Sequence, residues 1–167
     1  MPRPLLLTGG PAVGKSTCAR ALARSRPRAA LVDADDVRQL VVAGAVAPWQ
    51  GPEGRAQHAL GARNAAGLAR SFVAAGFEVV VADVVTPATA ALYRAELPDV
   101  LLVHLRISLD GARRRAATRS VHLTDDEFAL LHGWQADPPR ADVVLDVDGL
   151  SVEQQVASLR EHWAAAL

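Results

Sequence analysis

The residues of this chain best suited to chemistry form a glycine-rich stretch near its start. Residues 9–17 read GGPAVGKST, which fits the pattern G-x-x-x-x-G-K-[ST]. Glycines let successive backbone N–H groups face one anion, and the N-terminus of the following helix adds positive partial charge. The lysine of such a loop reaches the β- and γ-phosphates of a nucleotide, and the serine hydroxyl ligates Mg²⁺. We therefore expect a loop that binds the phosphates of ATP, formed by Gly9, Gly10, Pro11, Ala12, Val13, Gly14, Lys15, Ser16 and Thr17.

The use of basic residues supports this interpretation. The chain has 18 lysines and arginines, and Lys15 is the one lysine among them. A sequence that uses arginine at every other basic position has kept a lysine where the phosphate-loop pattern requires one. We therefore assign Lys15 a catalytic role, in which it stabilises phosphate charge during transfer.

Carboxylates follow the second and third predicted strands. A carboxylate near an acceptor hydroxyl can take its proton as the γ-phosphoryl group moves, and we assign this role to Asp35. In the alternative, Asp35 only caps the helix that begins there, and Asp33 or Asp36 is the base. Asp83 ends a buried strand, where an aspartate can hold a water of the Mg²⁺ ion. The predicted metal site is Ser16 with Asp83.

Arginines are expected to complete the site. Arg38 lies about one turn after Asp35, and Arg63 lies on a long helix that could reach the acceptor. A second group crowds one helix near residues 109–120, where the positive charges repel one another unless an anion is close. Arg115 and Arg119 share a face of this helix and are the best pair to act on the phosphoryl group. The alternative is a basic surface patch. The acceptor-binding residues predicted from sequence are Asp33, Arg38, Asp83 and Arg63.

Apolar runs of strand length alternate with segments of helical periodicity along the whole chain. Such alternation predicts an α/β fold with a parallel, doubly wound sheet and ligands at the carboxyl ends of its strands. No linker or repeat divides residues 1–167, which we expect to form one domain. Strands are expected at 4–8, 29–32, 77–82, 100–107 and 143–147, and helices at 15–26, 36–42, 54–75, 86–97, 109–119, 124–135 and 151–166, with a loop at 44–54.

Three families of small kinases resemble this sequence beyond the phosphate loop. LVDADDVRQL, residues 31–40, resembles a segment of adenylylsulfate kinases that faces the phosphoryl acceptor. Chloramphenicol phosphotransferases have an acidic base that falls on Asp35. Tunicamycin-resistance ATP-binding proteins are similar in length, in the strand VVVADVVTP and in a lid like Arg115 to Arg119. The segment DVDGLSVEQQ is similar to one that passes near the adenine in these kinases, which implies adenine contacts from Asp148, Gly149 and Leu150.

These resemblances imply a three-layer P-loop NTPase fold, with a five-stranded parallel sheet, helices on both faces and a lid helix near 109–120. In the small kinases that this sequence resembles, the position of Asp83 can contact the acceptor instead of the metal. The expected activity is phosphoryl transfer from ATP, with Mg²⁺, to a hydroxyl of a small molecule such as an antibiotic or a nucleoside-like compound. Two alternatives are a resistance protein that sequesters a ligand without turnover and a nucleotide-sugar kinase of the toxin type. GTPases are disfavoured because the chain lacks an N-K-x-D guanine motif.

Charge and hydropathy limit the kinds of partner that the sequence supports. The formal net charge is zero and 4% of the residues are aromatic, so the sequence gives no basis for binding nucleic acid. No apolar run approaches the ~20 residues of a membrane-spanning helix. We expect a cytoplasmic protein, whose oligomeric state, a homodimer included, the sequence leaves open.

Overall fold

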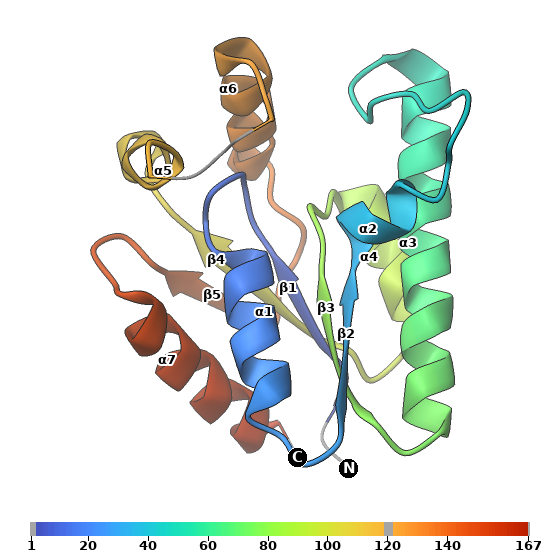
Figure 1. The fold of residues 1–167 in the computed structure, drawn as a ribbon, viewed down its shortest axis with the longest axis vertical. Helices are drawn as coiled ribbons and strands as arrows, with labels where there is room; N and C mark the ends of the chain where they lie inside the picture. Colours follow the sequence, from blue (N-terminus) through green and yellow to red (C-terminus); the bar gives the residue numbers. More distant parts are fainter. Residues whose placement is uncertain (1–2, 119–121, 167) are drawn as a thin grey trace.

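The computed structural model describes residues 3–118 and 122–166, and its centre is a parallel sheet (Figure 1). The sheet of these residues has five strands in the order β2-β3-β1-β4-β5, so the predicted fold class is confirmed. Each strand is short and mostly apolar, and the three inner strands are buried along almost their whole length, which suits strands covered on both faces. The strands are β1 (Leu5–Thr8), β2 (Ala29–Asp33), β3 (Glu78–Ala82), β4 (Leu101–Arg106) and β5 (Val143–Asp146).

Helices cover both faces of the sheet, as predicted. One face packs against α1 and α7, and the opposite face packs against α2, α3 and α4. α5 and α6 lie toward the carboxyl ends of the strands, where Figure 1 also shows α2 and the first turns of α3. The helices are α1 (Lys15–Arg24), α2 (Ala34–Arg38), α3 (Gly51–Ala74), α4 (Pro87–Glu96), α5 (Leu109–Ala116), α6 (Asp125–Gly133), a 3₁₀ turn η1 (Trp134–Ala136) and α7 (Val152–Ala165).

Several boundaries differ from the sequence prediction by one to four residues, and α2 ends at Arg38, before the predicted residue 42. Two helices begin earlier than predicted, each for a local reason. α2 is capped by Asp33, whose carboxylate accepts a hydrogen bond from the backbone N–H of Asp35, so neither Asp35 nor Asp36 is the cap. α3 begins at Gly51, inside the predicted loop 44–54. Pro52 favours this early start because the first helical turn leaves its N–H groups unpaired.

Capping boxes fix the start of three other helices. Thr86, Thr124 and Ser151 each accept a hydrogen bond from the third helical residue, which bonds back to the cap. The Thr124 capping box is the one predicted from sequence. α5 begins at the predicted residue and ends at Ala116, so it is shorter than the predicted helix 109–119.

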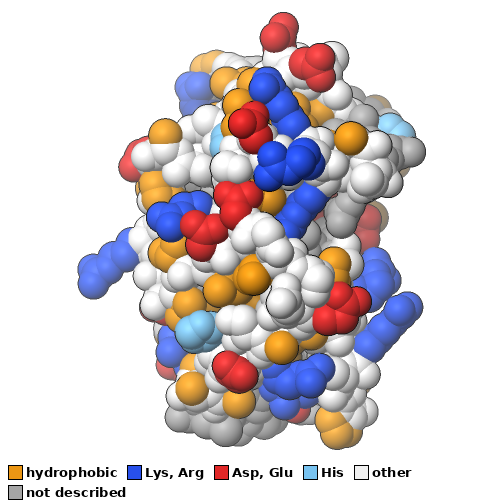
Figure 2. Space-filling model, turned by 90° about the vertical axis from the view of Figure 1, so that its left-hand side faces the viewer, with side chains coloured by type: hydrophobic (Ala, Val, Ile, Leu, Met, Phe, Trp, Pro, Cys, Tyr) orange, Lys and Arg blue, Asp and Glu red, His pale blue; other side chains and the backbone are white. Residues whose placement is uncertain are grey.

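The described surface has no dominant patch of one charge on the side carrying α5 and α7. Figure 2 shows acidic and basic side chains interspersed with apolar ones there. In the described part of the chain, no helix is long and apolar enough to cross a membrane.

Candidate active site

The loop between β1 and α1 needs glycine at two positions. A Cβ on Gly9 would lie 2.5 Å from the carbonyl oxygen of Leu105, which is closer than any side chain tolerates. Gly14 has a φ of 103° and forms the N-cap of α1, a conformation that residues with a Cβ rarely adopt. The loop therefore packs tightly against β4 and then turns its backbone sharply into α1.

Lys15 folds back over the phosphate loop. Its ammonium group donates hydrogen bonds of 2.8 Å to the carbonyl oxygens of Gly9 and Gly10. Burial lowers the pKa of Lys15 to about 8, although the carboxylates of Asp35, Asp83 and Asp33 oppose this shift. The protonation of a lysine with a lowered pKa depends on nearby anions, because a bound negative charge raises the pKa again and favours the protonated form.

We expect nucleotide affinity to fall as the pH rises above 8. The free protein then loses the Lys15 proton that bound phosphates require, so ATP should bind about tenfold more weakly at pH 9 than at pH 7. The free energy of unfolding, in contrast, should rise with pH between pH 8 and 10.5. In this range the unfolded chain still holds the proton that folded Lys15 has lost. Isothermal titration of ATP at both pH values checks this. A K15M variant should lose the pH dependence, and equal affinities in the unmutated protein would contradict the prediction.

Ser16 and Asp33 meet at the mouth of the loop. The Ser16 hydroxyl donates a 2.6 Å hydrogen bond to Asp33 Oδ2, while Asp33 Oδ1 caps α2. A hydroxyl beside a carboxylate is the kind of oxygen pair that Mg²⁺ prefers. The sequence had placed Asp33 with the acceptor, whereas the structure places it beside the phosphate loop.

Asp83 is the buried centre of a hydrogen-bonded group, contrary to its predicted place in a metal site. Its side chain is 0% exposed, with one oxygen bound by Arg38 and the other by the Tyr93 hydroxyl at 2.8 Å. Burial and the Asp83 carboxylate raise the pKa of Tyr93 well above its ordinary value, so Tyr93 remains a hydrogen-bond donor. With both oxygens hydrogen-bonded and the side chain fully buried, Asp83 holds Arg38 in position and is not among the residues that line the cavity beside the phosphate loop.

Asp35 has the opposite environment. Its side chain is 72% exposed, and Oδ1 accepts a 2.8 Å hydrogen bond from Arg38. Among the described residues, Oδ2 of Asp35 has no hydrogen-bond partner. Arg38 thus fixes the carboxylate at one oxygen and leaves the other able to accept a proton.

A cavity of about 450 Å³ joins these groups. Lys15, Ser16, Asp35 and Arg38 line it on the side of the phosphate loop. The remaining wall comes from the loop before α3, from α3 itself, from the end of β3 and from the segment around α6. These residues are Pro48, Trp49, His58, Val84, His122, Leu123, Leu131 and Trp134.

The predicted arginines fall into different places. Arg115 donates to the backbone carbonyls of Val13 at 2.9 Å, Val147 at 2.8 Å and Leu150 at 3.0 Å. It therefore ties the phosphate loop to the exit of β5 and does not point into the cavity, as its predicted phosphoryl contact would require. Arg63 is exposed on α3 and does not line the cavity. Arg119 lies outside the described residues.

A second hollow of about 450 Å³ lies beside Arg115. Asp148, Gly149 and Leu150, the residues expected near adenine, line it together with Gly111 of α5. Asp148 is fixed there by the backbone N–H and hydroxyl of Ser108, at 2.8 and 3.1 Å. The hollow shares no lining residue with the cavity beside Lys15 and Asp35, and it is linked to the phosphate loop through the hydrogen bond from Arg115 to Val13 O.

Sequence reasoning missed two residues of the site. Tyr93 is the only tyrosine of the sequence and lies on α4. From its position in the sequence its ring is expected to pack in the core, and it is indeed buried. His58 reads as one histidine on an alanine-rich helix, yet it lines the cavity and bonds to Val84 O. Neither carries a motif, so their positions in the site come from the packing of α3 and α4 against β3.

Comparison with known proteins identifies the fold. No protein-family model and no curated protein matches this sequence. The fold matches a sugar kinase from Janibacter sp. HTCC2649 (TM-score 0.74, 18% identity, 99% of this chain and 96% of that one). It also matches the adenylylsulfate kinase of Mycobacterium tuberculosis, solved with AMPPNP and adenylylsulfate (TM-score 0.68, 20% identity, 96% of both chains).

A third structure of this kind is the tunicamycin resistance protein of Deinococcus radiodurans (TM-score 0.66, 16% identity, 96% of this chain and 95% of that one). Two of the three families that the sequence resembles are therefore among the proteins that share its fold. The chain has the three-layer fold of the small P-loop kinases.

Proposed function

We propose that this protein transfers the γ-phosphoryl group of ATP to a hydroxyl group of a small molecule. The observation that carries the proposal is one cavity that brings Lys15 and Ser16 of the phosphate loop together with the exposed carboxylate of Asp35. The cavity extends past the phosphate loop to an apolar wall, which leaves room for a second substrate. The small kinases with the same fold support this class of reaction.

The residues present fit ATP and Mg²⁺. The β- and γ-phosphates would be held by the backbone of the phosphate loop and by Lys15. The adenine ring would lie beside Asp148, Gly149 and Leu150. Ser16 with Asp33 would hold the metal, in place of the predicted pair of Ser16 and Asp83, because both oxygens of Asp83 are already bound. When bound, Mg²⁺ neutralises charge that develops on the phosphate oxygens.

Asp35 is the proposed general base. The Asp35 oxygen that has no hydrogen-bond partner among the described residues takes the proton of the acceptor hydroxyl. At the same time the hydroxyl oxygen of the acceptor forms a bond to the γ-phosphorus. The bond between the γ-phosphorus and the bridging oxygen breaks, and ADP leaves. Arg38 positions Asp35 at 2.8 Å, and Asp83 with Tyr93 positions Arg38. Arg115 positions the phosphate loop from behind, and Arg119 keeps the role of lid arginine proposed from sequence.

ATP with Mg²⁺ is expected to raise the melting temperature, because a ligand that binds only the folded state stabilises it by mass action. At a concentration of 100 Kd the gain is about 2.7 kcal/mol. GTP should raise it less, since the chain lacks a guanine motif. Differential scanning fluorimetry with both nucleotides is the measurement, and equal shifts would overturn the preference for adenine.

The reaction itself is tested by incubating the protein with ATP, Mg²⁺ and a library of alcohols. We expect ADP release that an acceptor stimulates and, by mass spectrometry, an acceptor that gains one phosphoryl group. Ligand binding without either product would instead support the sequestering protein.

A further inference from the structure

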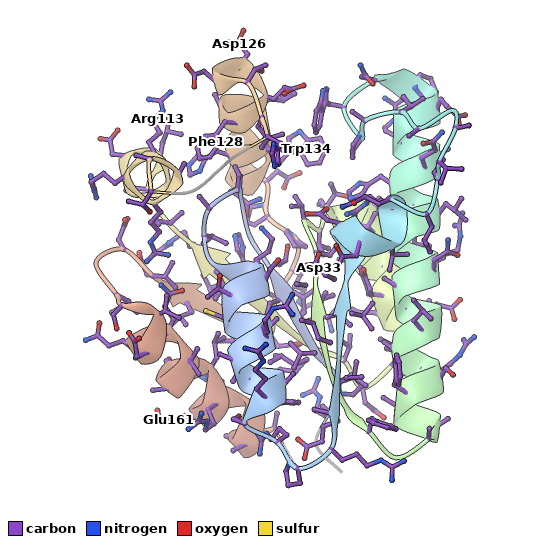
Figure 3. All side chains as sticks on the ribbon, in the orientation of Figure 1. Asp33, Arg113, Asp126, Phe128, Trp134 and Glu161 are labelled. Carbon is purple, nitrogen blue, oxygen red and sulfur yellow. The ribbon has the colours of Figure 1, made fainter. Side chains whose placement is uncertain are left out.

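The wall of the cavity that faces the phosphate loop is aromatic. Trp49 reaches it from the loop before α3, and Trp134 reaches it from the 3₁₀ turn after α6. Both rings are half-buried, so each keeps a face available to a ligand. Figure 3 shows Trp134 projecting from the base of α6 toward the side of the molecule that carries α2 and α3. Two indoles from distant segments thus converge on one space.

A neutral imidazole extends this surface. The ring centroid of His58 lies 6.0 Å from that of Trp134, with the planes tilted by 37°. Burial lowers the pKa of His58, so the ring is uncharged at neutral pH. Its Nε2 lies 2.9 Å from the carbonyl oxygen of Val84, to which the neutral tautomer donates. His58 therefore adds a flat, uncharged face beside Trp134.

The described residues give the cavity no spare buried cation for an anionic acceptor. Among its described lining residues, the lysine and arginine side chains are Lys15 and Arg38. Lys15 belongs to the phosphates of ATP. Arg38 is already bound by the carboxylates of Asp35 and Asp83, so its charge is balanced within the protein. His122 also lines the cavity, but it is exposed to water, which weakens any attraction to an anion.

A smaller recess of about 80 Å³ adjoins the cavity and shares Arg38, Pro48 and His58 with it. Most of its other lining side chains are apolar, Val37 and Leu60 among them. Arg38 Nε is buried there beside Gly61 and has no hydrogen-bond partner among the described residues. The recess thus offers room for a small apolar substituent and one donor for an oxygen atom on it.

From these observations we infer that the acceptor is an uncharged alcohol that carries a flat apolar ring. The ring stacks against Trp49 and Trp134, and the hydroxyl lies toward Asp35 and the phosphate loop. This inference rests on the proposed phosphotransferase function, since it describes the second substrate of that reaction. It disfavours sugar acids, nucleotides and other acceptors whose recognition requires a free guanidinium group.

The test measures binding without turnover. The protein is saturated with the non-hydrolysable analogue AMPPNP and Mg²⁺ and is titrated with matched pairs of alcohols. The neutral members are benzyl alcohol, 2-naphthalenemethanol and uridine, and the anionic members are 4-(hydroxymethyl)benzoate, 6-(hydroxymethyl)-2-naphthoate and uridine 5′-monophosphate. Tryptophan fluorescence is the readout. The third tryptophan, Trp163, is 0% exposed and bonds to Arg3 O, so it contributes a constant background.

We expect at least one neutral alcohol to change the fluorescence and to bind about tenfold more tightly than its anionic partner. W49A and W134A should each weaken the binding of that alcohol by about tenfold, because stacking on an aromatic side chain contributes affinity of that order. W49F should restore part of the loss, since it returns a ring without the indole. F72A is the matched control, because Phe72 is a partly exposed ring on α3 that does not line the cavity and should leave binding unchanged.

Three results would overturn the inference. They are tighter binding by the anionic members, no binding by any neutral member up to millimolar concentration, and unchanged affinity in both tryptophan variants. The proposed function fails separately, if ATP with Mg²⁺ does not bind or no acceptor stimulates ADP release. A protein that binds ATP and phosphorylates an anionic alcohol would keep the function and lose the inference.

Discussion

K15A is expected to abolish phosphoryl transfer while leaving the fold nearly intact. Lys15 is the one lysine of the chain, and its ammonium group lies on the phosphate loop, 2.8 Å from Gly9 O and Gly10 O. No second lysine can replace its charge beside the phosphates. Removing a single preorganised donor from a transition state commonly costs 10²–10³-fold in rate, and we expect a loss of roughly 10³-fold or more here because the donor is also charged.

The stability of the K15A protein should change little, because the folded state gives up a partly buried ammonium group whose burial is unfavourable. Turnover is measured by ADP release with the acceptor found in the library, and stability by thermal unfolding. R24A is the matched control, since Arg24 is an exposed cation in the last turn of the same helix and should keep normal turnover. Near-normal turnover by K15A would show that residues 9–17 are not the phosphate-binding loop of a kinase.

D35N should reduce phosphoryl transfer by roughly 10²–10⁴-fold, the usual contribution of a positioned general base. Asparagine keeps the size of the side chain and an oxygen for Arg38, but it cannot accept the proton of the acceptor hydroxyl. Nucleotide binding should survive, because the phosphate loop is a separate segment. Stability should change by at most ~1 kcal/mol, since Asp35 is exposed and Asp33, not Asp35, caps α2.

The same substitution at three other aspartates separates the roles that we propose for them. D36N is the matched control, because Asp36 is an exposed neighbour that does not line the cavity. D33N should raise the Mg²⁺ concentration needed for half-maximal turnover, since Asp33 accepts from Ser16. D83N should lower the melting temperature, because the buried ion pair with Arg38 is lost.

Turnover measurements on the four variants decide between these assignments. If D83N kept its fold and were alone inactive, the base assignment would be wrong and the chemistry would lie at the end of β3. If all four stayed active, carboxylate base catalysis would be excluded. Positioning and electrostatic stabilisation would then carry the transfer, which a loose, metaphosphate-like transition state permits.

The sequence by itself determined the fold class and the phosphate loop. Both are local properties. Alternating apolar runs and helical periodicity define a parallel α/β sheet, and the loop GGPAVGKST is a continuous segment whose glycines and lysine act where they stand in the chain. The capping box at Thr124 and Glu127 was predictable for the same reason, because its two residues are three positions apart.

The roles of the aspartates needed the tertiary structure. Asp33 and Asp83 both end strands, and nothing in their neighbouring residues distinguishes a side chain that meets Ser16 from one enclosed by Arg38 and Tyr93. The difference arises because β3 lies between β2 and β1 and α4 covers its end, which buries Asp83 and leaves Asp33 at the phosphate loop. The burial of Asp83 is therefore the reason that we place Asp33, and not Asp83, with Ser16 in the proposed metal site.

The acceptor side of the site depended still more on the fold. Arg115 belongs to a helix whose charges suggested contact with phosphate, yet the packing of α5 turns it onto three backbone carbonyls. Trp49 and Trp134 are 85 positions apart, and only the approach of α6 to the loop before α3 makes them one wall. Local sequence patterns specify groups that act within one turn or loop, whereas a substrate pocket is formed between elements whose packing the sequence specifies only collectively.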